Sequence, residues 1–142
     1  MVRYIDKVLA YVTRGRELLI FAHTAFPAAG LQVPGGTVEP GETPLAAVAR
    51  ELEEETGLTA FRIARLLGIV EGCFRADDQL RFTRRHFYHV IPTVPTPERW
   101  RHWERHASDG AGYEFELFWV PLPDGVPPLA GNQAALLSEL LC

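Results

Sequence analysis

Residues 35–58 read GGTVEPGETPLAAVARELEEETGL, and this stretch predicts a glycine-rich loop followed by one well-delimited helix. Thr43 suits the N-cap and Pro44 the first helical position, where the missing backbone N–H is not needed. Gly57 suits the left-handed residue that ends a helix. One apolar stripe, expected to face a hydrophobic core, recurs at spacings of three and four residues: Leu45, Val48, Ala49 and Leu52.

Three glutamates, Glu51, Glu54 and Glu55, share an arc of this helix beside the apolar stripe. Like charges at these spacings destabilise a helix by about 0.2–0.5 kcal/mol per pair, and the helix dipole disfavours anions near its C-terminal end. We expect Arg50 to project to a different side of the helix. A bound cation would neutralise the arc, because carboxylate oxygens are the hard ligands that Mg²⁺ and Mn²⁺ prefer. A solvated acidic helix face is the alternative interpretation.

The stretch resembles the Nudix box, Gly-x5-Glu-x7-Arg-Glu-U-x-Glu-Glu-x-Gly-U, in which U is an aliphatic residue. Nine positions of the box are defined, and together they make a specific signal. All nine match in this chain: Gly36, Glu42, Arg50, Glu51, Leu52, Glu54, Glu55, Gly57 and Leu58.

The resemblance implies an α/β fold of the Nudix type, an α/β/α sandwich with a mixed β-sheet between helices. The length of 142 residues suits one domain with a sizeable core, so we expect a single Nudix hydrolase domain over residues 1–142. Periodicity alone predicts only one domain of the α+β or α/β class.

The resemblance also implies the roles of the residues in the box. Glu51, Glu54 and Glu55 are expected to bind the metal, and one of them to act as the base. Gly36 is expected to contribute its backbone carbonyl to the metal site. Glu42 and Arg50 complete the expected catalytic set, as a pair that orders the loop against the helix.

A further acidic residue outside the box often completes the metal site in Nudix proteins. Glu116 is the first candidate, because it lies in a late run, Glu116–Leu122, that resembles a strand of the family. Glu114 shares a strand face with Glu116, and Glu104 precedes them in the predicted hairpin. These two are the next candidates.

The implied activity is the Mg²⁺-dependent hydrolysis of a pyrophosphate bond in a nucleoside diphosphate linked to another group X, with Mn²⁺ as a possible substitute. The enzyme would be a Nudix pyrophosphohydrolase acting on acid anhydrides. A non-catalytic nucleotide-binding or regulatory module on the same fold is one alternative. A domain stabilised by structural calcium or zinc is another, and it would lose its fold in EDTA.

Charge and composition restrict the partners. The net charge of −4 argues against a general nucleic-acid-binding surface. The N-terminus lacks an apolar signal core and no run is long enough to cross a bilayer, so we expect a cytoplasmic protein without membrane contact. Cys73 and Cys142 form no CxxC pair, which fits a reducing compartment. A monomer and a homodimer both remain open.

Patterns of β-branched and alternating residues predict strands along most of the chain: Tyr4–Val12, Glu17–His23, Leu31–Pro34, Thr59–Glu71 as one strand or two, Leu80–Ile91 and Tyr113–Leu122. A polar connection is expected at Gly72–Gln79, and a short helix at Asn132–Leu141. Arg99–His106 is expected to be a strand, joined by a turn to Tyr113. The alternative is a helix that would place His102 and His106 four residues apart, as zinc ligands.

Several residues outside the box are candidates for substrate contact. Arg81, Arg84 and Arg85 form a basic cluster, and arginine is suited to phosphate contact. His23 ends an apolar strand and is a second candidate. The aromatic residues that could stack on a base are Phe26, Phe87, Tyr88, Trp100 and Trp103.

Overall fold

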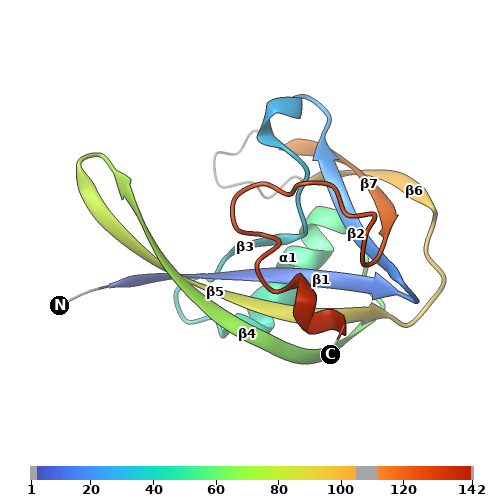
Figure 1. Ribbon diagram of the computed structural model, residues 1–142, viewed down its shortest axis with the longest axis horizontal. Helices are drawn as coiled ribbons and strands as arrows, with labels where there is room; N and C mark the ends of the chain where they lie inside the picture. Colours follow the sequence, from blue (N-terminus) through green and yellow to red (C-terminus); the bar gives the residue numbers. More distant parts are fainter. Residues whose placement is uncertain (1–2, 105–111, 142) are drawn as a thin grey trace.

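The computed structural model describes residues 3–104 and 112–141. Its sheet has the strand order β4-β5-β1-β2-β7-β6, and β3 also pairs with β1 (Figure 1). The pair β1–β5 is parallel and the other pairs are antiparallel, so the sheet is mixed, as expected. The strands are β1 Tyr4–Arg14, β2 Glu17–His23, β3 Gly35–Thr37, β4 Phe61–Ala76, β5 Gln79–Pro92, β6 Arg99–Glu104 and β7 Tyr113–Pro121.

Helix α1, Pro44–Thr56, has the predicted bounds. The Thr43 hydroxyl accepts a hydrogen bond from the Ala46 N–H at 3.1 Å, and Gly57 is left-handed with φ 77°. Ala47, Val48 and Leu52 are buried against the sheet. The prediction that Leu45 faces the core was wrong. Its side chain is 53% exposed, because the first turn of the helix extends beyond the core.

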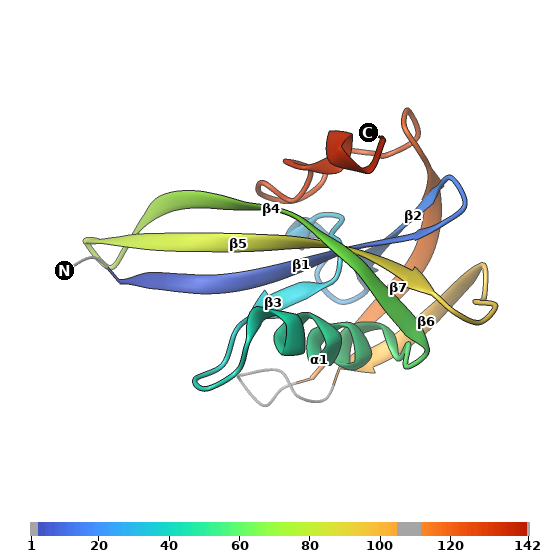
Figure 2. The ribbon, with the colours of Figure 1, turned by 90° about the horizontal axis from the view of Figure 1, so that it is seen from below.

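Hydrophobic residues pack on both faces of the sheet, in two clusters. Figure 2 shows α1 on one face and the C-terminal segment on the other. The helix expected at Asn132–Leu141 is instead a series of turns followed by the 3-10 helix η2, Leu137–Leu141. The Tyr11 hydroxyl donates to the Gln133 carbonyl at 2.5 Å and accepts from the Leu136 N–H at 3.2 Å. These contacts use backbone groups that an α-helix would pair internally.

The β4–β5 hairpin is longer than predicted and extends beyond the rest of the sheet (Figure 1). The polar connection expected at Gly72–Gln79 is wrong, because both strands continue to a two-residue turn at Asp77 and Asp78. These residues have φ values of 50° and 59°, a conformation that Asp tolerates in tight hairpin turns. The stretch that the sequence left as one strand or two is a single strand with irregular pairing.

The β6–β7 hairpin confirms the favoured interpretation of Arg99–His106 over the zinc-binding helix. Within it, His102 lies opposite Phe115 in the ladder. His106 and residues 107–111 of the predicted turn lie outside the described residues. The Trp100 indole N–H donates to the Thr56 carbonyl at 2.9 Å, which attaches β6 to the C-terminal end of α1.

A separate short 3-10 helix, η1 Pro27–Ala29, lies in the loop between β2 and β3. Within the described parts of the chain, no helix is both long and apolar enough to cross a membrane.

Candidate active site

Strand β3 brings the glycine pair directly against helix α1. Gly36 pairs with Val8 of β1, and a Cβ atom at position 36 would collide with the Glu51 carboxyl group. A larger residue at position 36 would therefore have to displace the Glu51 carboxyl group. The Gly36 backbone thus lies directly against a glutamate of the box.

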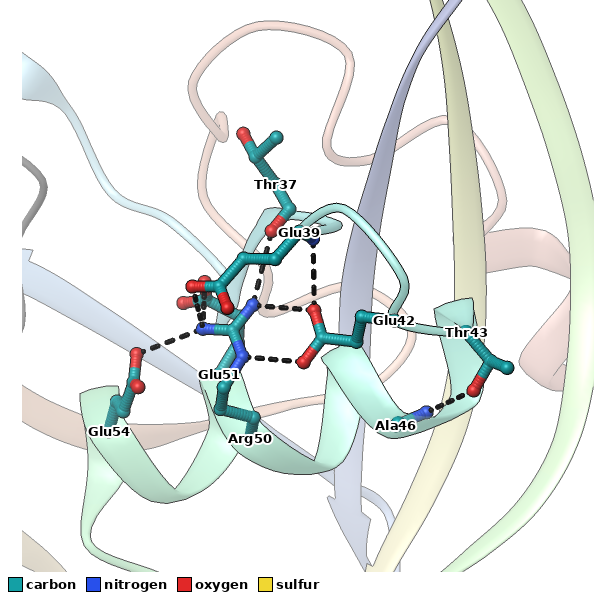
Figure 3. A network of polar contacts seen from close by, with 8 residues as sticks. All are labelled: Thr37, Glu39, Glu42, Thr43, Ala46, Arg50, Glu51 and Glu54. Carbon is teal, nitrogen blue, oxygen red and sulfur yellow. Dashed lines mark hydrogen bonds and ion pairs between the residues drawn. The ribbon is translucent and has the colours of Figure 1, made fainter.

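Arg50 joins the loop to the helix (Figure 3). Its guanidinium donates to both oxygens of Glu42, at 2.7 and 2.9 Å, which is the bidentate geometry typical of strong Arg–carboxylate pairs. It also donates to the Thr37 carbonyl at 3.2 Å. The structure thus brings together the pair that was expected to order the loop.

The same guanidinium also contacts the acidic arc of the helix. Its Nη1 lies 3.0 Å from Glu51 and 3.2 Å from Glu54. The expectation that Arg50 projects to a different side was wrong, because the long arginine side chain reaches along the helix surface to the next turn. Arg50 therefore partly neutralises the like charges that the sequence left unexplained.

Hydrogen bonding and burial shift the pKa values of two carboxyl groups beside Arg50 in opposite directions. The hydrogen bond from Arg50, followed by that from the Glu39 N–H, lowers the pKa of Glu42 to about 2. Burial raises the pKa of Glu51 to about 7, against the opposing effect of Arg50 and with smaller upward contributions from Glu54 and Glu104. Glu51 therefore binds a proton near neutral pH unless a further cation, in addition to Arg50, lies beside it.

Glu55 has a different environment from the other glutamates of the box. Its side chain is buried, and its Oε1 accepts a hydrogen bond from the Gly35 N–H at 2.6 Å. Burial raises its pKa well above the ordinary value. In the structure, Glu55 attaches the helix to β3.

Three other carboxylates converge on one point. Glu51 and Glu54 of α1 and Glu104 of β6 each offer an oxygen, and these oxygens lie within 4.8 Å of one another. Alternation along β6 explains the position of Glu104, because Trp100 and His102 on the same strand face also lie against the end of α1.

Glu116, the first candidate from the sequence, is not in this group. Phe115 and Leu117 point into the core beneath α1, so their neighbours Glu114 and Glu116 lie on the opposite sheet face. Glu116 instead pairs with Arg99 and Arg101. The structure therefore does not bring Glu116 to this group, and the alternation of Trp100, His102 and Glu104 is the sequence signal that favours Glu104.

The geometry of this carboxylate group fits a divalent cation. Carboxylates from two elements face one point, and Gly36 leaves room for the backbone to approach Glu51. Oxygen-only ligands of this kind suit Mg²⁺ or Mn²⁺ rather than a softer metal.

A cleft of about 260 Å³ lies beside the glycine pair. Its lining includes both glycines and also Lys7 and Arg85, which are partners in the β1–β5 ladder. Sequence reasoning missed Lys7, because a single lysine in a strand carries no signal of its own. Arg84 of the predicted basic cluster instead pairs with Asp6 at 3.0 Å.

The five predicted aromatic residues have different environments. Phe87 and Tyr88 are buried in the core, and Trp100 packs against it. Phe26 and Trp103 are 56% and 48% exposed.

Comparison with known proteins identifies the family. The NUDIX domain profile matches residues 3–140. The chain is 36% identical over 84 residues to diphosphoinositol polyphosphate phosphohydrolase 2 of Rattus norvegicus, covering 59% of this chain and 42% of that protein. It is 32% identical over 116 residues to diphosphoinositol polyphosphate phosphohydrolase 3-beta of Homo sapiens, covering 82% and 62%. The chain thus matches only part of the length of each relative.

Solved structures share the fold. A MutT NUDIX hydrolase from Burkholderia pseudomallei aligns with a TM-score of 0.66 and 24% identity, over 97% of this chain and 98% of that one. The NUDIX domain of Shewanella oneidensis NrtR, solved with ADP ribose, aligns with a TM-score of 0.68 and 18% identity, over 99% and 88%. Because the family profile covers almost the whole chain and the box is complete, this chain belongs to the Nudix hydrolase family.

Proposed function

We propose that this protein hydrolyses a pyrophosphate bond in a nucleoside diphosphate linked to another group, with Mg²⁺ or Mn²⁺ bound at the carboxylate group. The observation that carries the proposal is the convergence of Glu51, Glu54 and Glu104 beside Gly36. Membership of the Nudix family and the names of the phosphohydrolase relatives support it.

Each residue has a proposed role that follows from its position. Glu51, Glu54 and Glu104 hold the cation, with the Gly36 backbone carbonyl as a further oxygen ligand. A divalent cation held there would neutralise diphosphate oxygens and lower the pKa of a water molecule. Arg50 and Glu42 keep the loop and the helix in register, so that the oxygen ligands stay converged.

Glu55 has a separate proposed role. Its buried carboxyl group holds the Gly35 N–H and so positions β3 beside the helix. One glutamate of the helix would also accept the proton of the attacking water, because general bases in such sites are carboxylates within hydrogen-bonding reach of the nucleophile.

The cleft indicates where phosphates would bind. Lys7 and Arg85 face it, and among the described residues neither forms an ion pair. Because Gly36 also lines the cleft, a diphosphate bound there could contact the side chains of Lys7 and Arg85 and also the proposed metal site. Electrostatic stabilisation and positioning of this kind supply most of the catalysis in phosphoryl transfer.

A second substrate class is favoured by the extent of this basic surface. Arg81 lies four residues before Arg85 on β5 and so on the same strand face. This row of cations would suit a diphosphate that carries further phosphates, such as a diphosphoinositol polyphosphate, the class in the names of the two relatives. The alternative is a non-catalytic module that binds such a ligand without hydrolysing it.

A phosphate-release assay tests the proposal. Nucleoside diphosphate derivatives and diphosphoinositol polyphosphates would be offered with Mg²⁺ or Mn²⁺ to the wild type and to Glu54→Gln, which keeps the shape and removes one charge. We expect turnover of one class and a loss of about a hundredfold or more in the variant. If the folded wild type turns over no substrate with either metal but a diphosphate raises its Tm, the binding module is correct.

A further inference from the structure

Three rings pack together where β2 ends and β7 begins. The His23 ring centroid lies 5.0 Å from that of Phe26 and 4.8 Å from that of Tyr113, and the Phe26 and Tyr113 centroids are 6.2 Å apart. Phe115 supports the group, 5.1 Å from His23. We call His23, Phe26 and Tyr113 the aromatic cluster.

The aromatic cluster adjoins the carboxylate group through the β6–β7 ladder. Tyr113 is the direct ladder partner of Glu104, and Glu104 converges with Glu51 and Glu54. Side chains of directly opposite residues in an antiparallel pair lie on the same face, with Cβ atoms about 4.5–5.5 Å apart. A molecule whose phosphates lie at the carboxylates would therefore have its next group within reach of these rings.

Two features of the cluster are not explained by packing. Phe26 is 56% exposed, although a ring of this size is normally buried. The His23 Nδ1 is enclosed and has no hydrogen-bond partner within the described residues. Enclosed polar atoms without a partner are rare in native proteins, and a ligand is one explanation for them.

The exposed aromatic face of this cluster favours a ligand that carries a flat aromatic ring. An exposed phenylalanine face offers a stacking surface to any nucleobase, because every base has a π-face. A cyclic polyol has no π-face and offers Phe26 only its ring C–H groups, so it would stack more weakly than a base. The aromatic cluster therefore distinguishes nucleotides from inositol phosphates, whereas the basic cleft attracts both.

We infer that Phe26, held by His23 and Tyr113, is the stacking subsite for the base of a nucleotide substrate. The inference rests on the proposed function for the position of the phosphates and adds the substrate class. It also assigns the specificity to residues outside the box.

The test is a binding measurement that needs no turnover. Titration calorimetry in Mg²⁺ would compare AMP with ribose 5-phosphate, which differ only by the base. We expect AMP to bind the wild type about 5–150-fold more tightly, the range that one stacked base contributes. Phe26→Ala is expected to abolish this preference while leaving the affinity for ribose 5-phosphate unchanged, and Phe26→Trp to keep the preference.

Trp103→Ala is the matched control. Trp103 is also an exposed aromatic residue of this region, but alternation along β6 places it on the face opposite Glu104. We expect this variant to keep the full preference for AMP. Thermal unfolding of each variant would verify that it is folded.

Two results would overturn the inference: equal affinities of the wild type for AMP and ribose 5-phosphate, or an unchanged preference in folded Phe26→Ala. If the preference depends on Phe26 but no diphosphate is hydrolysed, the aromatic subsite is supported and the proposed hydrolysis fails. If a diphosphate is hydrolysed but the preference is absent, the hydrolysis stands and the subsite fails.

Discussion

Two basic groups flank the glycine strand β3, and their surroundings differ. Arg50, on the helix side, contacts Glu42, Glu51 and Glu54 and is 23% exposed. Lys7 and Arg85, on the side of the cleft, form no ion pair within the described residues. The difference indicates that Arg50 organises the protein itself, while Lys7 and Arg85 keep their hydrogen-bond donors available for a ligand.

The largest expected effect comes from adding a Cβ atom at Gly36, in the strand that lies between these two basic groups. Gly36→Ala places a Cβ against the Glu51 carboxyl group, so this carboxyl group has to shift from its present position. We expect pyrophosphate hydrolysis to fall by about a hundredfold or more, the loss that a 1 Å misplacement can cause. Steady-state kinetics in Mg²⁺ would measure it.

Gly72→Ala is the matched control for Gly36→Ala. A Cβ at position 72 would make ordinary contacts, the nearest at 3.6 Å from the Thr83 hydroxyl. This variant is expected to keep full activity. Wild-type activity in Gly36→Ala would show that the close approach to Glu51 is dispensable.

Removing Arg50 tests whether it is structural. Arg50→Met leaves Glu42, Glu51 and Glu54 without their common cation. At pH 8 in EDTA we expect the free energy of unfolding to fall by about 2–4 kcal/mol, less than for a fully buried pair because Arg50 is partly exposed. Urea denaturation would measure the change.

The control for Arg50 is Arg84→Met. Arg84 also pairs with a carboxylate, Asp6, but its side chain is 41% exposed. We expect a loss below about 1 kcal/mol. Equal losses in the two variants would contradict the special role of Arg50.

The free energy of unfolding of the metal-free protein is expected to depend on pH. The pKa of Glu51 rises from 4.5 to about 7 on folding, so the folded state binds more protons than the unfolded state between these pH values. The stabilisation from protonated Glu51 is fully present below pH 4.5. We expect the free energy of unfolding to fall by about 2–3 kcal/mol as the pH rises from 4.5 to 7. Glu51→Gln is expected to reduce this slope, and Glu55, whose pKa burial also raises, accounts for the slope that remains.

The pKa of Glu42 shifts in the opposite direction, so Glu42 does not account for a loss of stability between pH 4.5 and 7. Its lowered pKa stabilises the folded state above pH 4.5, and this contribution is lost only as the pH falls toward 2. Urea titrations at several pH values would follow both effects. A wild-type stability that stays constant or rises from pH 4.5 to 7 would contradict the assignment to Glu51.

The smallest expected effects concern the cleft. Lys7→Met and Arg85→Met should each change the free energy of unfolding by less than about 0.5 kcal/mol, because neither side chain holds an ion pair with another described residue. We expect each to weaken diphosphate binding by about tenfold, the contribution of one charge-assisted contact. Arg16→Met, in the turn between β1 and β2, is the control, and titration calorimetry would measure binding. Full affinity in both cleft variants would exclude the cleft as a phosphate site.

The sequence alone determined the elements that depend on neighbouring residues. Thr43, Pro44 and Gly57 delimit α1 because capping and left-handed closure are local effects. The spacing of the box predicted that Glu51 and Glu54 would lie together on the helix, and it identified Gly36 and Arg50. The β6–β7 hairpin followed from alternation within short segments.

Tertiary structure decided what depends on distant residues. Glu104 joins Glu51 and Glu54 only because β6 packs on the end of α1, and Glu116 is excluded because β7 turns it to the other face. The C-terminal segment forms turns because Tyr11, more than 100 residues earlier in the chain, holds its backbone. Such contacts leave no local pattern, since their energy comes from groups that only the folded chain brings together.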